Sequence, residues 1–258
     1  PLNNENVIRL IEDNQFENIH TAILATTPTS PTVSFECKLR INSQPRWYQV
    51  VALCLWADDN PSERTGFIGK AFDINESRLK REELEHQATH DTLTGLLNST
   101  SAKEHISKLL KENPESKYVM AFFDLDTFKS INDTYGHMFG DRILRQAADS
   151  LKESAGKNAV VARMGGDEFM VLLENPEDKV NAIERIFNSV KGCYDGIRVN
   201  ISMGIAETSA DCHDYRSLFH AADEALYFAK RLGKNRYSFY NDSMQGTLVS
   251  MFRDEKDT

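Results

Sequence analysis

The chain has 258 residues, of which 40% are hydrophobic and 27% charged, and its formal net charge at pH 7 is −9. This length provides a core for one domain of ordinary size and part of another. A protein this acidic is not expected to bind nucleic acid, because it lacks a basic stripe to replace the counterions on a phosphate backbone. The longest apolar stretch, residues 50–57, is far shorter than the roughly 20 residues that cross a bilayer, and no signal peptide opens the chain, so we expect a cytoplasmic protein with no membrane segment within these residues.

The first 75 residues indicate a helix, over about residues 4–26, followed by strands at 33–41, 47–56 and 66–74. Three antiparallel strands after a helix resemble the carboxyl-terminal half of a PAS sensor domain. This resemblance implies that residues 1–75 are a partial PAS-like sensor domain. Its large aromatic residues are then expected in core or dimer packing and not in cofactor binding.

Residues 76–89 are rich in charge and in helix-forming residues, with Leu79, Leu84 and Ala88 spaced roughly as a helical stripe. The pattern predicts a signalling helix that links two domains. A solvated single helix is the alternative, because so short a segment does not establish a coiled coil.

A second domain is expected over residues 90–241. The run from Tyr118 to Phe123 predicts a buried strand that leads directly into Asp124-Leu125-Asp126. Strands at 160–164 and 169–173 flank Gly165-Gly166-Asp167-Glu168, which has the composition of a tight hairpin. If this hairpin lies beside the first strand, Asp124 and Asp167 can reach one Mg²⁺, an ion that takes few protein ligands and fills its other positions with water and phosphate oxygens.

Four motifs stand in this second domain. They are D-x-L-T-G-L-x-N over 91–98, D-L-D-x-F-K-x-I-N-D-x-x-G-H-x-x-G-D-x-x-L over 124–144, R-x-G-G-D-E-F over 163–169 and A-D-x-A-L-Y-x-A-K-x-x-G-K-N over 222–235. In sequence and in order they resemble the GGDEF family of diguanylate cyclases. Together they span well over half of the chain, which makes a chance match far less probable than for a single short motif.

The resemblance implies an enzyme that condenses two GTP molecules into cyclic di-GMP and releases two pyrophosphates, with Mg²⁺ (or Mn²⁺) as its cofactor. By motif match, the metal is held by Asp124, Asp167 and the backbone carbonyl of Leu125, and Glu168 is either the general base or a ligand of a second metal. Lys129 is expected to stabilise the transition state or the triphosphate. Because one site holds one GTP, the reaction is expected to need a homodimer with two sites face to face.

The same match assigns the substrate contacts. Asp141 can accept hydrogen bonds from the N1–H and N2–H groups of guanine and Asn132 can serve its other edge, so this pair should select GTP over ATP. The other expected substrate contacts are Phe128, His137, Leu144, Lys230 and Lys234. Without the motifs, the leucine would be assigned to the core, the histidine to a turn and the lysines to the solvated surface.

Three positions depart from the family's usual sequence. Gly156-Lys157-Asn158-Ala159 stands where many members carry an R-x-x-D product-inhibition site, so feedback through that site is not expected. Ser99 replaces an arginine that usually follows the first motif. Lys234 occupies a place where arginine is also frequent, which turns a bidentate phosphate contact into a point-charge contact.

For residues 90–241 the expected fold is α+β, a central mainly antiparallel sheet flanked by helices, with further strands near 199–205 and 237–240. Residues 242–258 are expected to form a polar tail. Two other functions stay open: a catalytically silent GGDEF module that binds GTP and acts as a regulatory or interaction domain, and a cyclase that makes a cyclic mononucleotide. For the cyclic-mononucleotide alternative, Asp141 disfavours ATP as the substrate.

Overall fold

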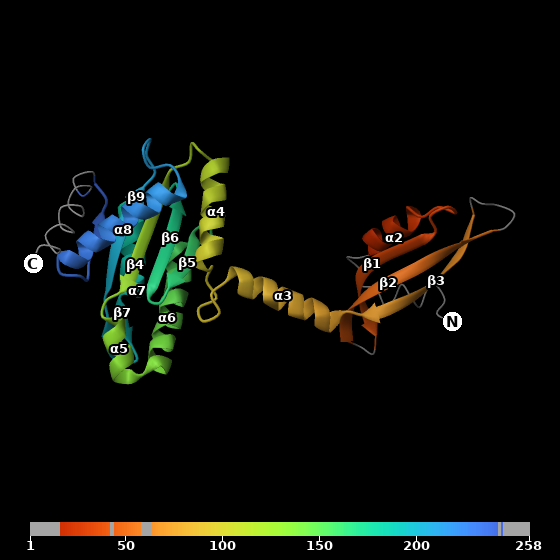
Figure 1. Cartoon of the computed structure of the whole chain (residues 1–258), viewed down its shortest axis with the longest axis horizontal. Helices are drawn as coiled ribbons and strands as arrows, with labels where there is room; N and C mark the ends of the chain where they lie inside the picture. The colour runs from red at the N-terminus through yellow and green to blue at the C-terminus, as the bar shows by residue number, and fades with distance from the viewer. Residues whose placement is uncertain (1–15, 42–43, 58–62, 242–243, 245–258) are drawn as a thin grey trace, which may run out of the picture. The chain divides into compact units, whose positions relative to one another are not determined.

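The computed structural model describes residues 16–41, 44–57, 63–241 and 244 (Figure 1). The chain divides into two compact units, residues 1–86 and 87–258. Within the described ranges, every helix is too short or too polar to cross a membrane. Apart from Met244, the tail predicted at 242–258 lies outside the described residues.

The described part of the first unit contains a three-stranded antiparallel sheet, preceded by a helix. Its elements are α2 (Phe16–Leu24), β1 (Thr32–Ile41), β2 (Gln44–Trp56) and β3 (Arg64–Asp73), with the sheet order β1-β2-β3. Cys37 and Leu39 of β1 are buried with Ile19 of α2, whereas Glu36 and Arg40 are exposed, which confirms the alternation predicted for this strand. Of the helix expected over about 4–26, only the part from residue 16 is described. The PAS-like assignment of this unit stays a prediction.

The helix predicted at 76–89 is present as α3 (Asn75–Thr89). It buries none of its residues, and Leu79 and Leu84 are 57% and 52% exposed. Arg78 forms an ion pair with Glu82 at 3.2 Å along its surface. A helix exposed on all sides agrees with a signalling helix that pairs in a dimer and equally with a solvated single helix, so both alternatives stay open.

The second unit is built around a five-stranded sheet with the order β10-β9-β4-β6-β5. Four strands are antiparallel neighbours, and the short edge strand β10 runs parallel to β9. Their bounds are β4 (Tyr118–Leu125), β5 (Val160–Gly165), β6 (Glu168–Glu174), β9 (Ile201–Glu207) and β10 (Tyr237–Phe239). Alternate residues of central β4 enter two separate hydrophobic clusters, Met120 one and Ala121 the other. Because both faces are covered, the strand is apolar without interruption and not alternating.

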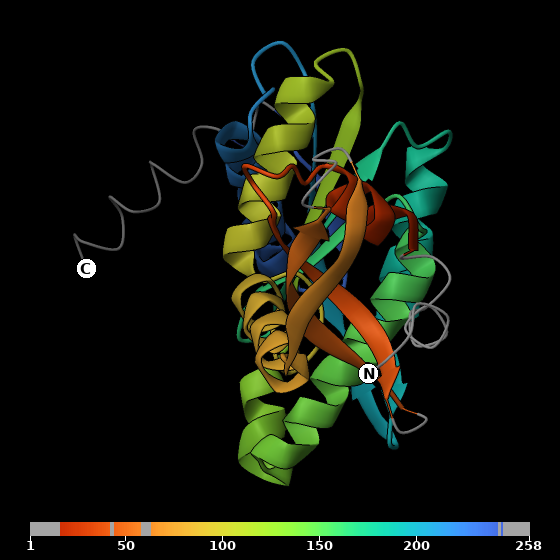
Figure 2. The ribbon, with the colours of Figure 1, turned by 90° about the vertical axis from the view of Figure 1, so that its right-hand side faces the viewer.

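Helices cover the two faces of this sheet (Figure 2). On one face lie α4 (Ser99–Glu112) and α8 (Tyr215–Arg231), and on the other α6 (His137–Ala155) and α7 (Lys179–Val190), with α5 (Phe128–Tyr135) packed on α6. Side chains of Asn98, Asp178 and Asp214 cap the starts of α4, α7 and α8 by accepting backbone hydrogen bonds. The mixed α+β fold predicted from the sequence is confirmed.

The strand predicted near 199–205 is present two residues further along as β9 (Ile201–Glu207), but the short hairpin that precedes it was not predicted. The chain forms a hairpin of β7 (Gly192–Tyr194) and β8 (Ile197–Val199), leaves it at Asn200 and enters β9 at Ile201. The turn of this hairpin is Asp195-Gly196, whose φ angles are 49° and 84°. Asp-Gly is the pair that favours a two-residue hairpin turn, because both central residues need positive φ. That signal in the sequence was overlooked.

Candidate functional site

The predicted acidic residues come together at one end of the sheet. In the register of the antiparallel strands β4 and β6, Asp124 lies opposite Glu168. The N–H of Leu125 donates to the carbonyl of Asp167 at 3.3 Å, which ties the end of β4 to the hairpin. From α8, the Nζ of Lys230 lies 2.5 Å from Oδ2 of Asp124. Residues more than 100 positions apart in sequence therefore share one site.

The carboxylates of this site are partly buried and repel one another. Burial raises the pKa of Asp124, and the charges of Asp167 and Asp126 add to the rise, against an opposing effect of Lys230. Burial and the charge of Asp167 likewise raise the pKa of Glu168. Because the negative charges of Asp124 and Glu168 are disfavoured by burial and by neighbouring carboxylates, a cation bound between them would stabilise their charged forms.

Asp124 also has an oxygen with no partner. Its Oδ1 is buried and accepts no hydrogen bond from the described residues. Those residues hold no closed group of three or more His, Cys, Asp or Glu side chains around a metal position. Mg²⁺ is usually bound by one or two carboxylates together with phosphate oxygens and water, so an unpartnered carboxylate oxygen beside Asp167 and Glu168 fits an open magnesium site.

Arg163 holds the glycine hairpin in place. The φ angles of Gly165 and Gly166 are 151° and 51°, and a side chain is disfavoured at both. Arg163 donates from Nη2 to the Gly166 carbonyl at 2.6 Å and from Nη1 to Asp91 Oδ1 at 3.0 Å. Burial raises the pKa of Asp91, but hydrogen bonds from Thr94 and Arg163 outweigh it and leave the pKa below its usual value. Asp91 and Arg163 belong to two of the predicted motifs, but this structural role was not predicted for them.

The two residues expected to recognise guanine lie on neighbouring helices. Asn132 is on α5 and Asp141 on α6, and the two helices meet at Gly136, whose φ is 83°. Oδ1 of Asn132 is buried and has no hydrogen-bond partner among the described residues. It lies so close to Gly140 that a Cβ there would be 1.9 Å away. An unpartnered buried acceptor beside Gly140, the residue before Asp141, leaves hydrogen-bonding capacity for a base.

The other residues expected to contact substrate differ in their surroundings. Phe128 and Leu144 are 8% and 2% exposed and belong to the hydrophobic core, so their contact with a base stays a prediction. The side chains of Lys129, His137 and Lys234 are exposed and form no ion pair within the described ranges. Only Lys230 among the predicted lysines is joined to the acidic residues in this part of the structure.

Two acidic residues near the site were not predicted. Asp223 of α8 contributes to the raised pKa of Glu168 through its negative charge. Asp126 is 7% exposed and accepts hydrogen bonds from Ser202 Oγ at 2.7 Å and from the Asn235 N–H at 2.9 Å. It follows Asp124 by two positions, yet its oxygens bind other parts of the chain.

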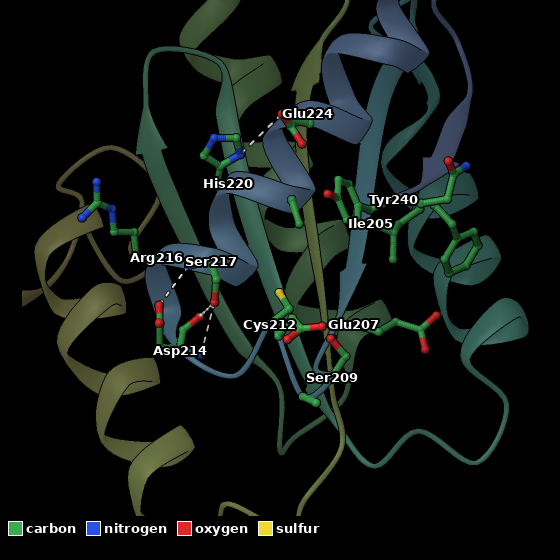
Figure 3. A pocket seen from close by; sticks show the side chains of 15 residues that line it. Ile205, Glu207, Ser209, Cys212, Asp214, Arg216, Ser217, His220, Glu224 and Tyr240 are labelled. Atoms are coloured by element: carbon green, nitrogen blue, oxygen red, sulfur yellow. Dashed lines mark hydrogen bonds and ion pairs between the residues drawn. The ribbon is translucent and has the colours of Figure 1, made fainter. Parts of the chain in front are cut away.

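A hollow of about 760 Å³ is present elsewhere in the second unit. Figure 3 shows the side chains that line it. It is lined by residues of β9, of the loop and helix from 209 to 224, and of 239–241. Its residue Glu207 pairs with Val119 at the start of β4, whereas Asp124 at the end of β4 pairs with Ser202. The hollow contains none of the predicted site residues.

A family model described as "Diguanylate cyclase, GGDEF domain" matches residues 88–236. Among solved structures, the GGDEF domain of DgcB from Caulobacter crescentus in complex with c-di-GMP is 29% identical with a TM-score of 0.55, and the match covers 59% of this chain and 95% of that one.

Curated relatives are similar over the same region. MucR of Pseudomonas aeruginosa, a bifunctional diguanylate cyclase/cyclic di-GMP phosphodiesterase, is 33% identical over an alignment of 170 residues that covers 63% of this chain and 25% of MucR. DgcE of Escherichia coli, a probable diguanylate cyclase, is 30% identical over an alignment of 233 residues that covers 87% of this chain and 21% of DgcE. The chain thus spans about a quarter of the length of these relatives.

Proposed function

This chain belongs to the GGDEF family of diguanylate cyclases, and from that premise we propose that it condenses two molecules of GTP into cyclic di-GMP and two pyrophosphates. The observation that carries the proposal is the meeting of Asp124, Asp167 and Glu168 at one sheet end, beside Lys230. Such a reaction needs positioning and charge neutralisation more than covalent chemistry from the protein.

Asp124, Asp167 and the Leu125 carbonyl would hold Mg²⁺ or Mn²⁺, which neutralises charge on the phosphates when bound. The 3′-oxygen of one GTP forms a bond to the α-phosphorus of the other, the bond to pyrophosphate breaks, and Glu168 takes the proton of the hydroxyl if it acts as the base. Its raised pKa makes Glu168 a better proton acceptor than an ordinary carboxylate. Lys129, Lys230 and Lys234 would bind phosphate oxygens.

Base selection rests on Asn132 and Asp141. A carboxylate at Asp141 accepts from the N1–H and N2–H donors of guanine, whereas adenine presents no matching pair of donors. The half-buried position of Asp141 makes a missing partner costly. His137, Phe128 and Leu144 complete the proposed nucleotide contacts.

Catalysis in this proposal requires a homodimer, because each site holds one GTP and two phosphodiester bonds must form. The first unit, as a partial PAS-like sensor, would regulate how two cyclase units meet, and α3 would transmit the signal. Consumption of GTP places the reaction in the cytoplasm. With Gly156 and Ala159 where an R-x-x-D site would need Arg and Asp, feedback through that site is not expected.

The test is incubation of the purified chain with GTP and Mg²⁺. We expect a product with the mass of cyclic di-GMP, two pyrophosphates for each product molecule, no product from ATP, and loss of turnover with a chelator. Binding of GTP without any product would instead identify a silent regulatory module. A cyclic mononucleotide as product would identify a different cyclase.

A further inference from the structure

Asp126 is a buried carboxylate to which the proposed reaction assigns no role. Its Oδ1 accepts a hydrogen bond of 2.7 Å from Ser202 Oγ on β9, and its Oδ2 accepts one of 2.9 Å from the N–H of Asn235. Its own N–H donates to the carbonyl of Asn200 at 2.8 Å. Each carboxylate oxygen of Asp126 therefore already has a hydrogen-bond partner within the chain. Asp124, with its unpartnered Oδ1, differs in this respect.

The loop that Asp126 contacts has an unfavourable backbone. It follows α8, and the φ angles of Gly233, Lys234 and Asn235 are 110°, 60° and 49°. Positive φ is rare for a residue with a Cβ, least so for Asn. Strained conformations of this kind persist only where neighbouring contacts hold them. The bond from the Asn235 N–H to a buried, charged acceptor is the strong type of hydrogen bond that can do so.

Lys234 depends on this loop for its direction. Its side chain is exposed and has no ion pair with any described residue, and its N–H donates to the Ala229 carbonyl at 3.2 Å. Lys230, one helical turn earlier, is instead held by its ion pair with Asp124. Because no ion pair holds its side chain, the place from which the Lys234 ammonium can reach a ligand depends on where the loop holds its backbone.

We propose that Asp126 is a positioning residue, which holds the loop 233–235 so that Lys234 points its ammonium group at the anionic phosphates of a bound nucleoside triphosphate. This inference rests on the proposed function. Asp126 acts here through Lys234 and neither binds the metal nor touches the substrate. The bond that carries this role is the one from the Asn235 N–H to the carboxylate.

The experiment is a double-mutant cycle on binding. The affinity for a non-hydrolysable GTP analogue with Mg²⁺ is measured by calorimetry for the wild type, Asp126→Asn, Lys234→Ala and the double variant. Each single change should weaken binding about ten-fold, but Lys234→Ala should cost less than about two-fold once Asp126 is replaced. Ser202→Ala removes the other bond to Asp126 and should change affinity less than about two-fold. Additive losses, or equal losses from Asp126→Asn and Ser202→Ala, would overturn the inference in favour of a purely structural role.

A second variant loosens the same loop without touching the buried carboxylate. Asn235→Ala places a less tolerant residue at φ 49°, on the surface, and should also weaken binding of the analogue and diminish the effect of Lys234→Ala. Asn175→Ala is the matched control, because Asn175 has φ 42° at the far end of β6. Equal affinities for these two variants would contradict the inference even if Asp126→Asn does not fold.

These readouts separate the inference from the proposed reaction. A wild type that binds the analogue but releases no cyclic di-GMP refutes the cyclase activity, and the binding cycle still decides the role of Asp126. A wild type that does not bind the analogue overturns both.

Discussion

Gly140 offers a test of guanine recognition that leaves the acidic cluster untouched. A Cβ at this position would lie 1.9 Å from Asn132 Oδ1 and 3.0 Å from Phe128 Cζ. A carbon and an oxygen that are not bonded cannot approach to 1.9 Å, so Gly140→Ala must turn the Asn132 amide away. The amide is the end of a flexible side chain, and it can rotate without separating α5 from α6. The contact with Phe128 needs only a small shift.

The effects of Gly140→Ala on stability nearly cancel. Alanine favours a helix interior over glycine by about 1 kcal/mol, and the displaced Oδ1 gives up no hydrogen bond with the described residues. Crowding of Phe128 offsets part of this gain, so the free energy of unfolding should change by no more than about 1 kcal/mol. The loss of one hydrogen bond to guanine, about 0.5–1.5 kcal/mol, should weaken GTP binding by roughly 2- to 10-fold.

The assay is titration with a non-hydrolysable GTP analogue, together with thermal unfolding. Gly140→Ala should match Asn132→Ala in affinity and stay near the wild type in Tm. The control is Asp149→Ala, an exposed change on the same helix that should alter neither quantity much. Wild-type affinity in a folded Gly140→Ala variant would refute the contact between Asn132 and the base.

Three further outcomes are expected. Asp167→Ala and Glu168→Gln should each lower the rate of cyclic di-GMP formation at least about 100-fold with little change in Tm, and turnover that survives both changes would remove these residues from the reaction. Asp141→Ser should reduce the preference for GTP over ATP by a few kcal/mol, about 100-fold, which competition between the two nucleotides measures; an unchanged preference would place base selection elsewhere. Asp91→Asn should cost about 1–3 kcal/mol in urea unfolding at pH 7, because it breaks a partly buried ion pair with Arg163. The pKa of Asp91 in the folded protein is below its usual value of about 3.9. The stabilisation by Asp91 is therefore complete above about pH 3.9 and is lost as the pH falls through the lower, folded-state pKa. The free energies of unfolding of the wild type and Asp91→Asn should then converge at low pH, and a difference that stays constant down to pH 2 would contradict this.

Local signals in the sequence were sufficient for the centre of the second unit. The apolar run at Tyr118–Phe123 predicted β4, and the glycines before Asp167 predicted the β5–β6 hairpin; both are observed. The hairpin at Asp195-Gly196 was missed, although its signal was equally local. The first unit shows the predicted alternation, but a three-stranded sheet has no invariant chemistry that would identify it.

The sequence by itself determined which side chains of this protein can perform chemistry, because charge, acidity and strand-forming tendency belong to individual residues and their near neighbours. Only the tertiary structure decided what each acidic group contacts. Asp124 and Asp126 have the same side chain and lie two positions apart, yet one carries an unpartnered oxygen beside Lys230 and the other binds Ser202 and Asn235. The reason is that hydrogen-bond partners come from strands and loops about 75 to 110 residues further along the chain, whose approach depends on sheet order and register, and a motif contains no information on either.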